Sequence, residues 1–186
     1  MSVRALFLDR DGTLMVDVGY PSLPEQVELL PGAAEALAAL REAGYRLSII
    51  SNQSGVGRGY FDAAAVEAVH QRLLDLLAVH GVPIDDAEYC LHAPEDGCDC
   101  RKPSPLMIRR SADRLGVDPA QSFMIGDKAS DIEAGRRAGC RTILLDPTGA
   151  GGTQADFVCR DWEDIVQAVR RITDRPVAAG SRTGSA

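Results

Sequence analysis

Short apolar runs alternate with helix-like patterns along this chain, and this alternation restricts its fold more than any other feature. Strands that alternate with helices form βαβ units, whose strands pair in parallel and are covered by helices on both faces. The sequence therefore predicts an α/β fold, a Rossmann-like three-layer sandwich around a mainly parallel sheet. The predicted strands lie at residues 5–8, 47–50, 88–91, 122–125, 142–145 and 157–159.

Helix start and stop signals lie between these strands, and 186 residues are enough for one domain with its own core. We expect one domain over residues 1–173 and a flexible tail over residues 174–186, which is rich in Gly, Ser and Ala. The predicted helices run from Pro31 to Gly44, from Asp62 to Gly81, from Ser104 to Gly116, from Ser130 to Gly139, and from Asp161 to Thr173.

Polar residues follow the predicted strands at the point where each strand ends. In open α/β sheets, ligands bind in the crevice beyond the carboxyl ends of the strands. Polar residues that only happened to lie on the surface would not follow strand ends so regularly. The residues expected at this edge are Asp9, Asp11, Ser51, Asn52, Lys102 and Asp127.

The carboxylates of Asp9 and Asp11 suit covalent phosphoryl transfer. Asp9 lies at a strand end, where it can attack phosphorus and form an acyl phosphate. Asp11 emerges on the same side of a turn that Gly12 permits, and can protonate the leaving group and then activate water. Two aspartates at a turn are often only solvated side chains. The other polar strand ends favour the catalytic interpretation.

A magnesium ion fits this set because magnesium prefers oxygen ligands. The predicted ligands are Asp9, the backbone carbonyl of Asp11, and Asp127. Ser51 and Lys102 can bind the phosphoryl oxygens, where negative charge must be stabilised. We expect Asp131, four residues after Asp127, to orient Lys102 or metal-bound water without itself binding the metal.

Three of the five cysteines cluster with a histidine, in a pattern that suits tetrahedral zinc. The four predicted ligands leave no open position, so this zinc would be structural and would fix the two cations that follow, Arg101 and Lys102. The alternatives are a disulfide between two of these cysteines or scattered buried thiols. The predicted zinc ligands are Cys90, His92, Cys98 and Cys100.

Four motifs in order resemble the haloacid dehalogenase superfamily of phosphatases. They are DRDGT at 9–13, SN at 51–52, KP at 102–103 and GDxxxD at 126–131. The resemblance covers most of the chain, from about residue 6 to residue 145. It implies a magnesium-dependent phosphatase that works through a phospho-aspartate.

The cysteine loop, CLHAPEDGCDCRKP at 90–103, looks like the branch that contains heptose bisphosphate and histidinol phosphate phosphatases. That branch has no separate cap domain. The stretches DVGY at 17–20, NQSGVGRG at 52–59 and GDK at 126–128 favour the heptose enzymes, which cleave the C7 phosphate, although Leu91 replaces their usual proline. The substrate contacts implied by this resemblance are Asp17, Val18, Gly19, Tyr20, Ser51, Asn52, Gln53, Ser54, Arg101, Lys102 and Lys128.

Several alternatives remain open at this point. Histidinol phosphate or another small sugar phosphate would need the same chemistry and metals. A phospho-receiver domain would need a phosphoacceptor aspartate after its third strand, where this chain has the Cys/His loop. An inactive, zinc-stabilised binding module would not need its full set of catalytic residues. A dehalogenase would lack Asp11, and an ion-pump ATPase would have threonine there.

Charge and hydropathy restrict the partners. A net charge of −7 disfavours nucleic acid, whose binders concentrate Lys and Arg. No apolar run reaches the ~18 residues of a membrane span. The first residues, MSVRALFLDRDGT, are not typical of a signal peptide. We therefore expect a cytoplasmic, monomeric enzyme acting on a small phosphorylated sugar.

Overall fold

Six parallel strands form one sheet in the computed structural model, which describes residues 3–149, 151 and 154–173. The strand order is β3-β2-β1-β4-β5-β6, so the chain builds the sheet outward from β1 in one direction and then in the other. The order reverses between β1 and β4, and such a switch point opens a ligand crevice at the carboxyl edge. The strands are β1 Arg4–Leu8, β2 Tyr45–Asn52, β3 Asp86–Cys90, β4 Phe123–Gly126, β5 Arg141–Leu145 and β6 Phe157–Cys159.

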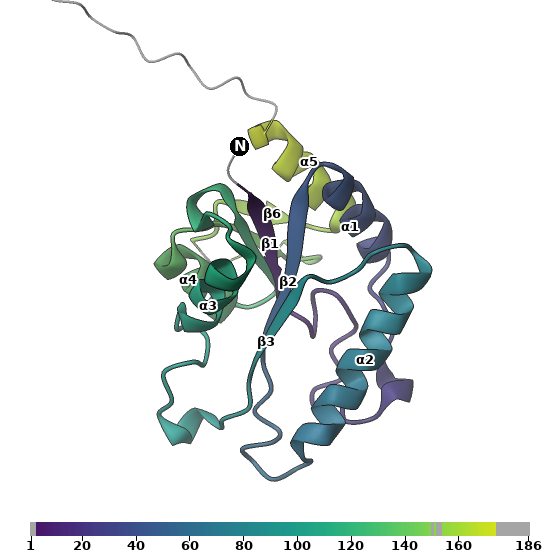
Figure 1. Ribbon diagram of the computed structural model, residues 1–186, viewed down its shortest axis with the longest axis vertical. Helices are drawn as coiled ribbons and strands as arrows, with labels where there is room; N and C mark the ends of the chain where they lie inside the picture. Colours follow the sequence, from purple (N-terminus) through teal and green to yellow (C-terminus); the bar gives the residue numbers. More distant parts are fainter. Residues whose placement is uncertain (1–2, 150, 152–153, 174–186) are drawn as a thin grey trace, which may run out of the picture.

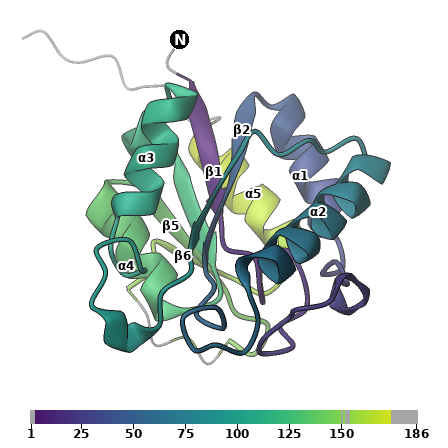
Figure 2. The ribbon, with the colours of Figure 1, turned by 60° about the horizontal axis from the view of Figure 1, so that its bottom comes forward.

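Helices cover both faces of the sheet, as Figures 1 and 2 show. One face packs against α1 Ala33–Glu42, α2 Ala63–Val79 and α5 Trp162–Thr173. The other face packs against α3 Leu106–Leu115 and α4 Ala129–Ala138. The predicted three-layer α/β sandwich with a parallel sheet is therefore confirmed.

Strand β1 shows why these residues form a central strand. Successive side chains of a strand point to opposite faces. Leu6 and Leu8 lie in the core beneath α1, α2 and α5, while Ala5 and Phe7 lie in the core beneath α3 and α4. All four side chains are fully buried, so β1 after Arg4 is apolar on both faces, as expected of a strand inside the sheet.

Three helices begin at a different residue from the one predicted. Helix α1 begins at Ala33 with Gly32 as its N-cap, two residues after the predicted Pro31. Helix α4 has Lys128 as its N-cap, because the Asp131 side chain at the third helical position accepts a hydrogen bond from the Lys128 N–H at 3.0 Å. Ser130 is therefore inside the helix and does not cap it. The N-cap of α3 is Pro105, one residue after the predicted Ser104.

The two long connections contain little regular structure of their own. The segment between β1 and α1 has one 3-10 turn, Pro24–Gln26, and is anchored by the fully buried Leu14 and Met15. The segment between β3 and α3 has the turn Pro94–Asp96. A third turn, Pro119–Gln121, precedes β4. Among the described residues, neither connection builds a second domain over the sheet edge.

Two further points concern the ends and the surface of the chain. The predicted flexible tail at 174–186 lies outside the described residues. Within the described part, none of the helices has the length and apolar character that crossing a bilayer requires.

Candidate active site

The carboxyl ends of β1 and β4 bring three aspartates together. Asp9 directly follows β1, and Asp127 directly follows β4. The Asp9 N–H donates to the Ile125 carbonyl at 2.9 Å, which continues the ladder between these strands to the site. One carboxylate oxygen each from Asp9, Asp127 and Asp131 lies within 4.8 Å of the others. Figure 2 turns this edge of the sheet toward the reader.

Lys102 enters this group from the connection between β3 and α3. Its Nζ lies 2.7 Å from Asp9 Oδ1 and 2.6 Å from Asp131 Oδ1, and donates to the Ile50 carbonyl at 2.6 Å. Burial would lower the pKa of Lys102, but the two carboxylates outweigh burial and raise it. Burial would likewise raise the pKa of Asp9, yet the Lys102 ammonium holds it below its usual range. Asp9 is therefore an ionised carboxylate with a fixed orientation.

Asn52 at the end of β2 fixes the backbone of Lys102. Its amide accepts from the Lys102 N–H at 3.0 Å and donates to the Lys102 carbonyl at 3.1 Å. This pair of hydrogen bonds holds a loop residue against the rigid sheet, so the ammonium reaches the buried carboxylates from a defined direction. The Asn52 amide therefore has a positioning task that its motif alone did not indicate.

The residues around Asp127 fit a divalent cation. Burial raises the pKa of Asp127 to about 7, and the nearby carboxylates of Asp9 and Asp131 add to this rise. Asp127 Oδ1 is buried without a hydrogen-bond partner among the described residues. Buried carboxylates without a partner are costly, and a hard cation would satisfy them. Gly12 makes room here, because a Cβ at this position would lie 2.4 Å from Asp127 Oδ2.

Asp11 points into a separate buried network. Gln53 Nε2 donates to Asp11 Oδ2 at 2.7 Å and to Ser51 Oγ at 3.0 Å. Arg10 contacts the same carboxylate, with NH2 3.1 Å from Asp11 Oδ2. Burial raises the pKa of Asp11 despite the guanidinium of Arg10, and the Asp9 carboxylate contributes to the rise. A carboxyl group whose pKa is raised can carry a proton at the stage when a leaving group needs one.

Arg10 is the site residue that the sequence analysis did not single out. It is fully buried, and its NH2 donates to Gln53 Oε1 at 2.8 Å, so it holds the amide that in turn holds Asp11. The available signal was an arginine between two aspartates directly after an apolar strand. A charged side chain in that position is rarely buried unless it is paired.

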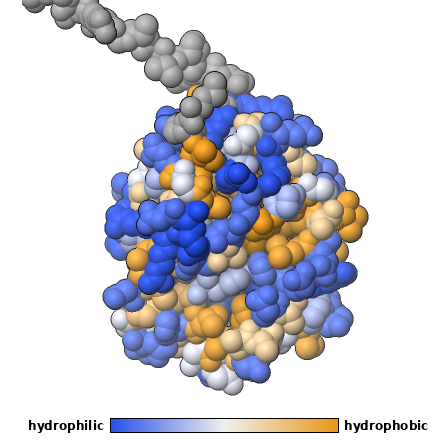
Figure 3. All heavy atoms as spheres, viewed as in Figure 1, coloured by the Kyte–Doolittle hydropathy of each residue, from blue (hydrophilic) through white to orange (hydrophobic). Residues whose placement is uncertain are grey.

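Most of the predicted substrate contacts line one hollow of about 350 Å³ at this edge. Ser51 and Lys102 are buried beneath it, and the exposed Val18 is not in its lining. In Figure 3 hydrophobic residues are exposed among hydrophilic ones toward the bottom of the molecule. The residues that line the hollow are Asp11, Asp17, Gly19, Tyr20, Asn52, Gln53, Ser54, Arg101, Lys128 and Ser130.

The cysteine loop brings its four predicted ligands together. Cys98 Sγ lies 3.6 Å from both Cys90 Sγ and Cys100 Sγ, and His92 Nδ1 lies 3.4 Å from Cys100 Sγ. A zinc ion with bonds of ~2.3 Å to tetrahedral sulfurs would space them about 3.8 Å apart. The cysteines are not joined in disulfides. The donor set and its spacing therefore fit zinc.

Zinc is expected in the purified protein at about one ion per chain. Replacing Cys98 with serine should remove the zinc and lower activity, because the loop then no longer fixes the cations that follow it. Elemental analysis of the wild type and Cys98→Ser measures this directly. Cys140→Ala, which removes a buried thiol outside the cluster, is the control that should retain zinc. Active, fully reduced protein without zinc would contradict the assignment.

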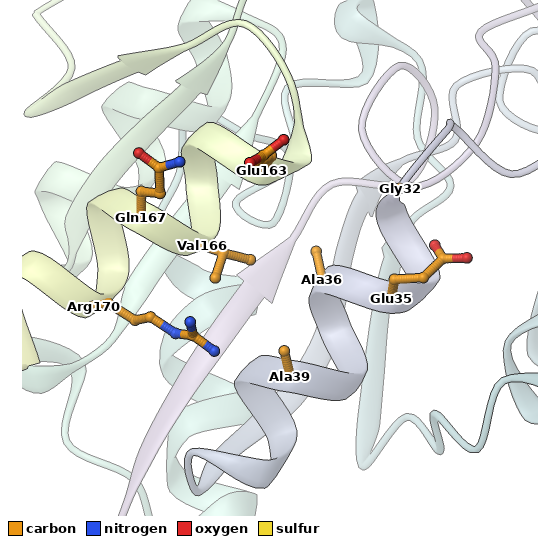
Figure 4. Close-up of a pocket in the computed structure, with 8 residues that line it drawn as sticks. All are labelled: Gly32, Glu35, Ala36, Ala39, Glu163, Val166, Gln167 and Arg170. Carbon is orange, nitrogen blue, oxygen red and sulfur yellow. The ribbon is translucent and has the colours of Figure 1, made fainter.

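A second hollow of about 390 Å³ lies between α1 and α5, away from the strand ends. Ala36 and Ala39 face Val166 across its floor, and charged side chains surround it (Figure 4). It brings together neither the aspartates nor the lysine that phosphoryl transfer needs. The chemistry therefore belongs to the hollow at the sheet edge.

Comparison with known proteins agrees with this geometry. The family model described as HAD-hydrolase-like matches residues 99–161. The D-glycero-β-D-manno-heptose-1,7-bisphosphate 7-phosphatase of Pseudomonas aeruginosa is 41% identical, over 81% of this chain and 85% of that protein. The enzyme of the same name from Haemophilus ducreyi is 38% identical, over 91% of this chain and 100% of its own.

A solved structure shows the same relationship. The heptose 1,7-bisphosphate phosphatase of B. bronchiseptica, complexed with magnesium and phosphate, superposes with a TM-score of 0.82 at 34% identity, covering 91% of this chain and 98% of that one. The fold and the aspartate site together define a phosphatase of the HAD-like hydrolases. Within that class, the chain belongs to the family of the heptose bisphosphate phosphatases with which it is compared here.

Proposed function

We propose that this chain is a magnesium-dependent phosphatase that hydrolyses the C7 phosphate of D-glycero-β-D-manno-heptose 1,7-bisphosphate through a phospho-aspartate on Asp9. The observation that carries the proposal is the buried Asp9–Lys102–Asp131 cluster at the base of a hollow with two cations in its lining. The names of the relatives supply the substrate.

Asp9 is the proposed nucleophile. Its pKa is held low, so the carboxylate is ionised at neutral pH and an oxygen is available to attack phosphorus. Lys102 orients Asp9 by contacting Oδ1, and its positive charge can stabilise the negative phosphoryl oxygens, to which the Ser51 hydroxyl can donate a hydrogen bond. Both side chains are buried and held in place by hydrogen bonds.

Asp9, Asp127 and the Asp11 backbone carbonyl are the proposed magnesium ligands. Asp127 Oδ1 has no hydrogen-bond partner among the described residues, which supports this assignment. The Asp131 carboxylate instead pairs with Lys102 Nζ and accepts from the Lys128 N–H. Magnesium would supply Lewis-acid stabilisation of the transferred phosphoryl group. Asp131 would then act by orienting Lys102.

Asp11 is the proposed general acid and base. Its raised pKa favours a protonated carboxyl group that can donate to the leaving sugar oxygen. Once that proton is gone, the same carboxylate can accept one from the water that attacks the acyl phosphate. The hydrogen bond from Gln53 and the ion pair with Arg10 hold the group at the wall of the hollow between the two steps.

Arg101 and Lys128 are the proposed contacts for the second phosphate. Both line the hollow, while Lys102 is occupied with Asp9 beneath it. Lys128 Nζ lies 3.0 Å from Asp17 Oδ2, so Lys128 is paired with a carboxylate. Arg101 is the second cation at the rim of the hollow. Histidinol phosphate has no second phosphate and carries a cationic amine, which these cations would repel.

Arg101→Ala is expected to lower kcat/KM for the heptose bisphosphate about 10- to 100-fold, because a bidentate contact with phosphate is lost. A simple aryl phosphate should lose far less. Specificity constants for both substrates and for histidinol phosphate measure this. Arg109→Ala, which removes an exposed guanidinium on α3, is the control. Equal or better turnover of histidinol phosphate by the wild type would overturn the substrate while leaving the phosphatase chemistry intact.

The same proposal covers partners and compartment. One chain supplies every group named above, so we propose an active monomer. The three unpaired thiols of the cysteine loop suit a reducing compartment such as the cytoplasm.

A further inference from the structure

Two exposed tyrosines meet at the mouth of the hollow. The ring centroids of Tyr20 and Tyr60 lie 4.9 Å apart with an interplanar angle of 88°, an edge-to-face pair. The two residues are 46% and 60% exposed, so burial in the core does not hold them together. Tyr20 lines the hollow, whereas Tyr60 is outside the lining and reaches the site only through Tyr20.

The loop that carries Tyr60 has a backbone fixed by its own contacts. The Tyr60 N–H donates to the Gly55 carbonyl at 2.9 Å, and the Arg58 N–H donates to the Ser54 carbonyl at 3.0 Å. Phe61 folds over Gly55 so closely that a Cβ there would lie 2.2 Å from the Phe61 ring. The direction of the Tyr60 side chain therefore follows from a compact turn.

The cysteine loop supports that turn from behind. The Gly57 N–H donates to the Leu91 carbonyl at 2.8 Å, and Arg58 lies 3.5 Å from Glu95. A Cβ on Gly57 would lie 2.3 Å from the Ala93 backbone nitrogen, so only glycine allows this approach. The segment from Gly55 to Tyr60 is thus braced against the segment that contains the proposed zinc ligands.

The loop that carries Tyr20 is anchored differently. Its local turn is closed by the Gly19 N–H, which donates to Asp17 Oδ1 at 2.8 Å. Asp17 Oδ2 contacts Lys128 on the other side of the hollow. Within the described residues, the contact with Tyr60 is the one aromatic contact of Tyr20. The orientation of the Tyr20 ring therefore depends on Tyr60.

We propose that Tyr60 is a positioning residue for substrate recognition: its ring holds Tyr20 upright as an apolar wall of the hollow. A sugar phosphate has C–H faces as well as hydroxyls, and a tyrosine ring offers them a large rigid surface with little side-chain entropy to lose. Because the described residues include no cap domain, a wall made by two loops takes over that part of substrate enclosure. This inference rests on the proposed function, since it assumes a phosphorylated sugar.

The test is a double-mutant cycle with Tyr60→Ala, Tyr20→Ala and the double variant. Tyr60→Ala is expected to raise KM for the heptose bisphosphate about 5- to 10-fold with kcat changed less than about 2-fold. Tyr60→Phe, which keeps the ring, should restore the wild-type KM. The double variant should be no worse than Tyr20→Ala, because Tyr60 acts through Tyr20. Val79→Ala, an exposed side chain on α2, is the matched control.

Two results would overturn the inference. One is an unchanged KM in Tyr60→Ala, and the other is additive losses in the double variant. Acetyl phosphate, which is too small to contact the wall, should respond less than the bisphosphate. If the wild type does not hydrolyse the heptose bisphosphate, the proposed substrate fails, and the same cycle on whichever hexose phosphate it does hydrolyse still decides the role of Tyr60.

Discussion

Asp9→Asn is expected to reduce turnover at least about 10⁴-fold while the fold survives. An amide cannot form the acyl phosphate, but it has nearly the same size and its oxygen can still accept from Lys102 Nζ. Asp9 is only 4% exposed, so a change of shape would disturb the core, whereas asparagine preserves the shape. Steady-state kinetics with magnesium, and thermal unfolding of the same samples, separate the two effects.

A second measurement identifies the intermediate itself. Acid quench of the wild type during turnover should trap one phosphoryl group on the protein, at Asp9, and Asp9→Asn should trap none. Asp17→Asn is the matched control, since Asp17 is an aspartate of the same hollow that lies at its rim beside Lys128. It should retain the trapped group. Near-normal turnover by Asp9→Asn would refute covalent catalysis at this residue.

The position of Asp9 also shows why the centre of the site was predictable from the sequence. Parallel strands end at one edge of a sheet, so Asp9 after β1 and Asp127 after β4 were expected at the same edge, and the pairing of β1 with β4 makes them neighbours. The grouping of Cys90, His92, Cys98 and Cys100 was predictable for a different reason. Two closely spaced ligand pairs on a short loop have few other ways to satisfy their polar groups.

Side-chain directions were not predictable in the same way. The motif places Gln53 after β2, but nothing in its spacing shows that its amide binds Asp11 and Ser51. Arg10 is fully buried although it adjoins a polar turn, and its hydrogen bond to Gln53 depends on a three-dimensional position that the sequence does not show. The contacts of Gln53 with Asp11 and Arg10 join residues from separate strand ends, and all of these contacts depend on rotamers that the pattern of residue types does not specify.

The contact of Tyr20 with Tyr60 was likewise not predictable from the sequence. It joins two irregular loops, each of which follows a different strand, and neither loop has a periodic pattern. The start of α4 at Lys128 is a smaller case. Ser130 is a favourable cap residue, but the Asp131 carboxylate accepts from the N–H of Lys128, three residues earlier, and this bond sets the first turn there.

Lys102→Met is expected to destabilise the protein by about 3–5 kcal/mol in magnesium-free buffer at pH 8, because it leaves two buried carboxylates without their cation. Asp9 and Asp131 are 4% and 1% exposed, so water cannot replace the ammonium. Turnover should fall about 10²- to 10³-fold, since charge on the phosphoryl group loses a fixed counter-ion. Chemical denaturation and steady-state kinetics measure the two effects.

The pH dependence of this loss distinguishes an electrostatic cause from a packing cause. Without the ammonium, burial and mutual repulsion raise the pKa of Asp9 and Asp131 in the folded state above their unfolded values. Carboxyl groups whose folded pKa is raised stabilise the fold when protonated and lose that contribution as pH rises through the folded pKa. The difference in unfolding free energy between wild type and Lys102→Met should therefore be smaller at pH 5 than at pH 8. A cavity left by poor packing of methionine would give the same difference at both values.

Lys128→Met supplies the matched control, because it removes a second lysine that lies beside the same cluster of aspartates. Lys128 Nζ lies 3.7 Å from Asp127 Oδ2, but its side chain is 53% exposed and water can replace it. Its loss should cost less than about 1 kcal/mol, because solvent screens an exposed ion pair. Equal destabilisation by the two substitutions would mean that burial of Lys102 does not give it a special role. A larger, pH-dependent loss of unfolding free energy in Lys102→Met would mean that this lysine both stabilises the fold and orients the nucleophile.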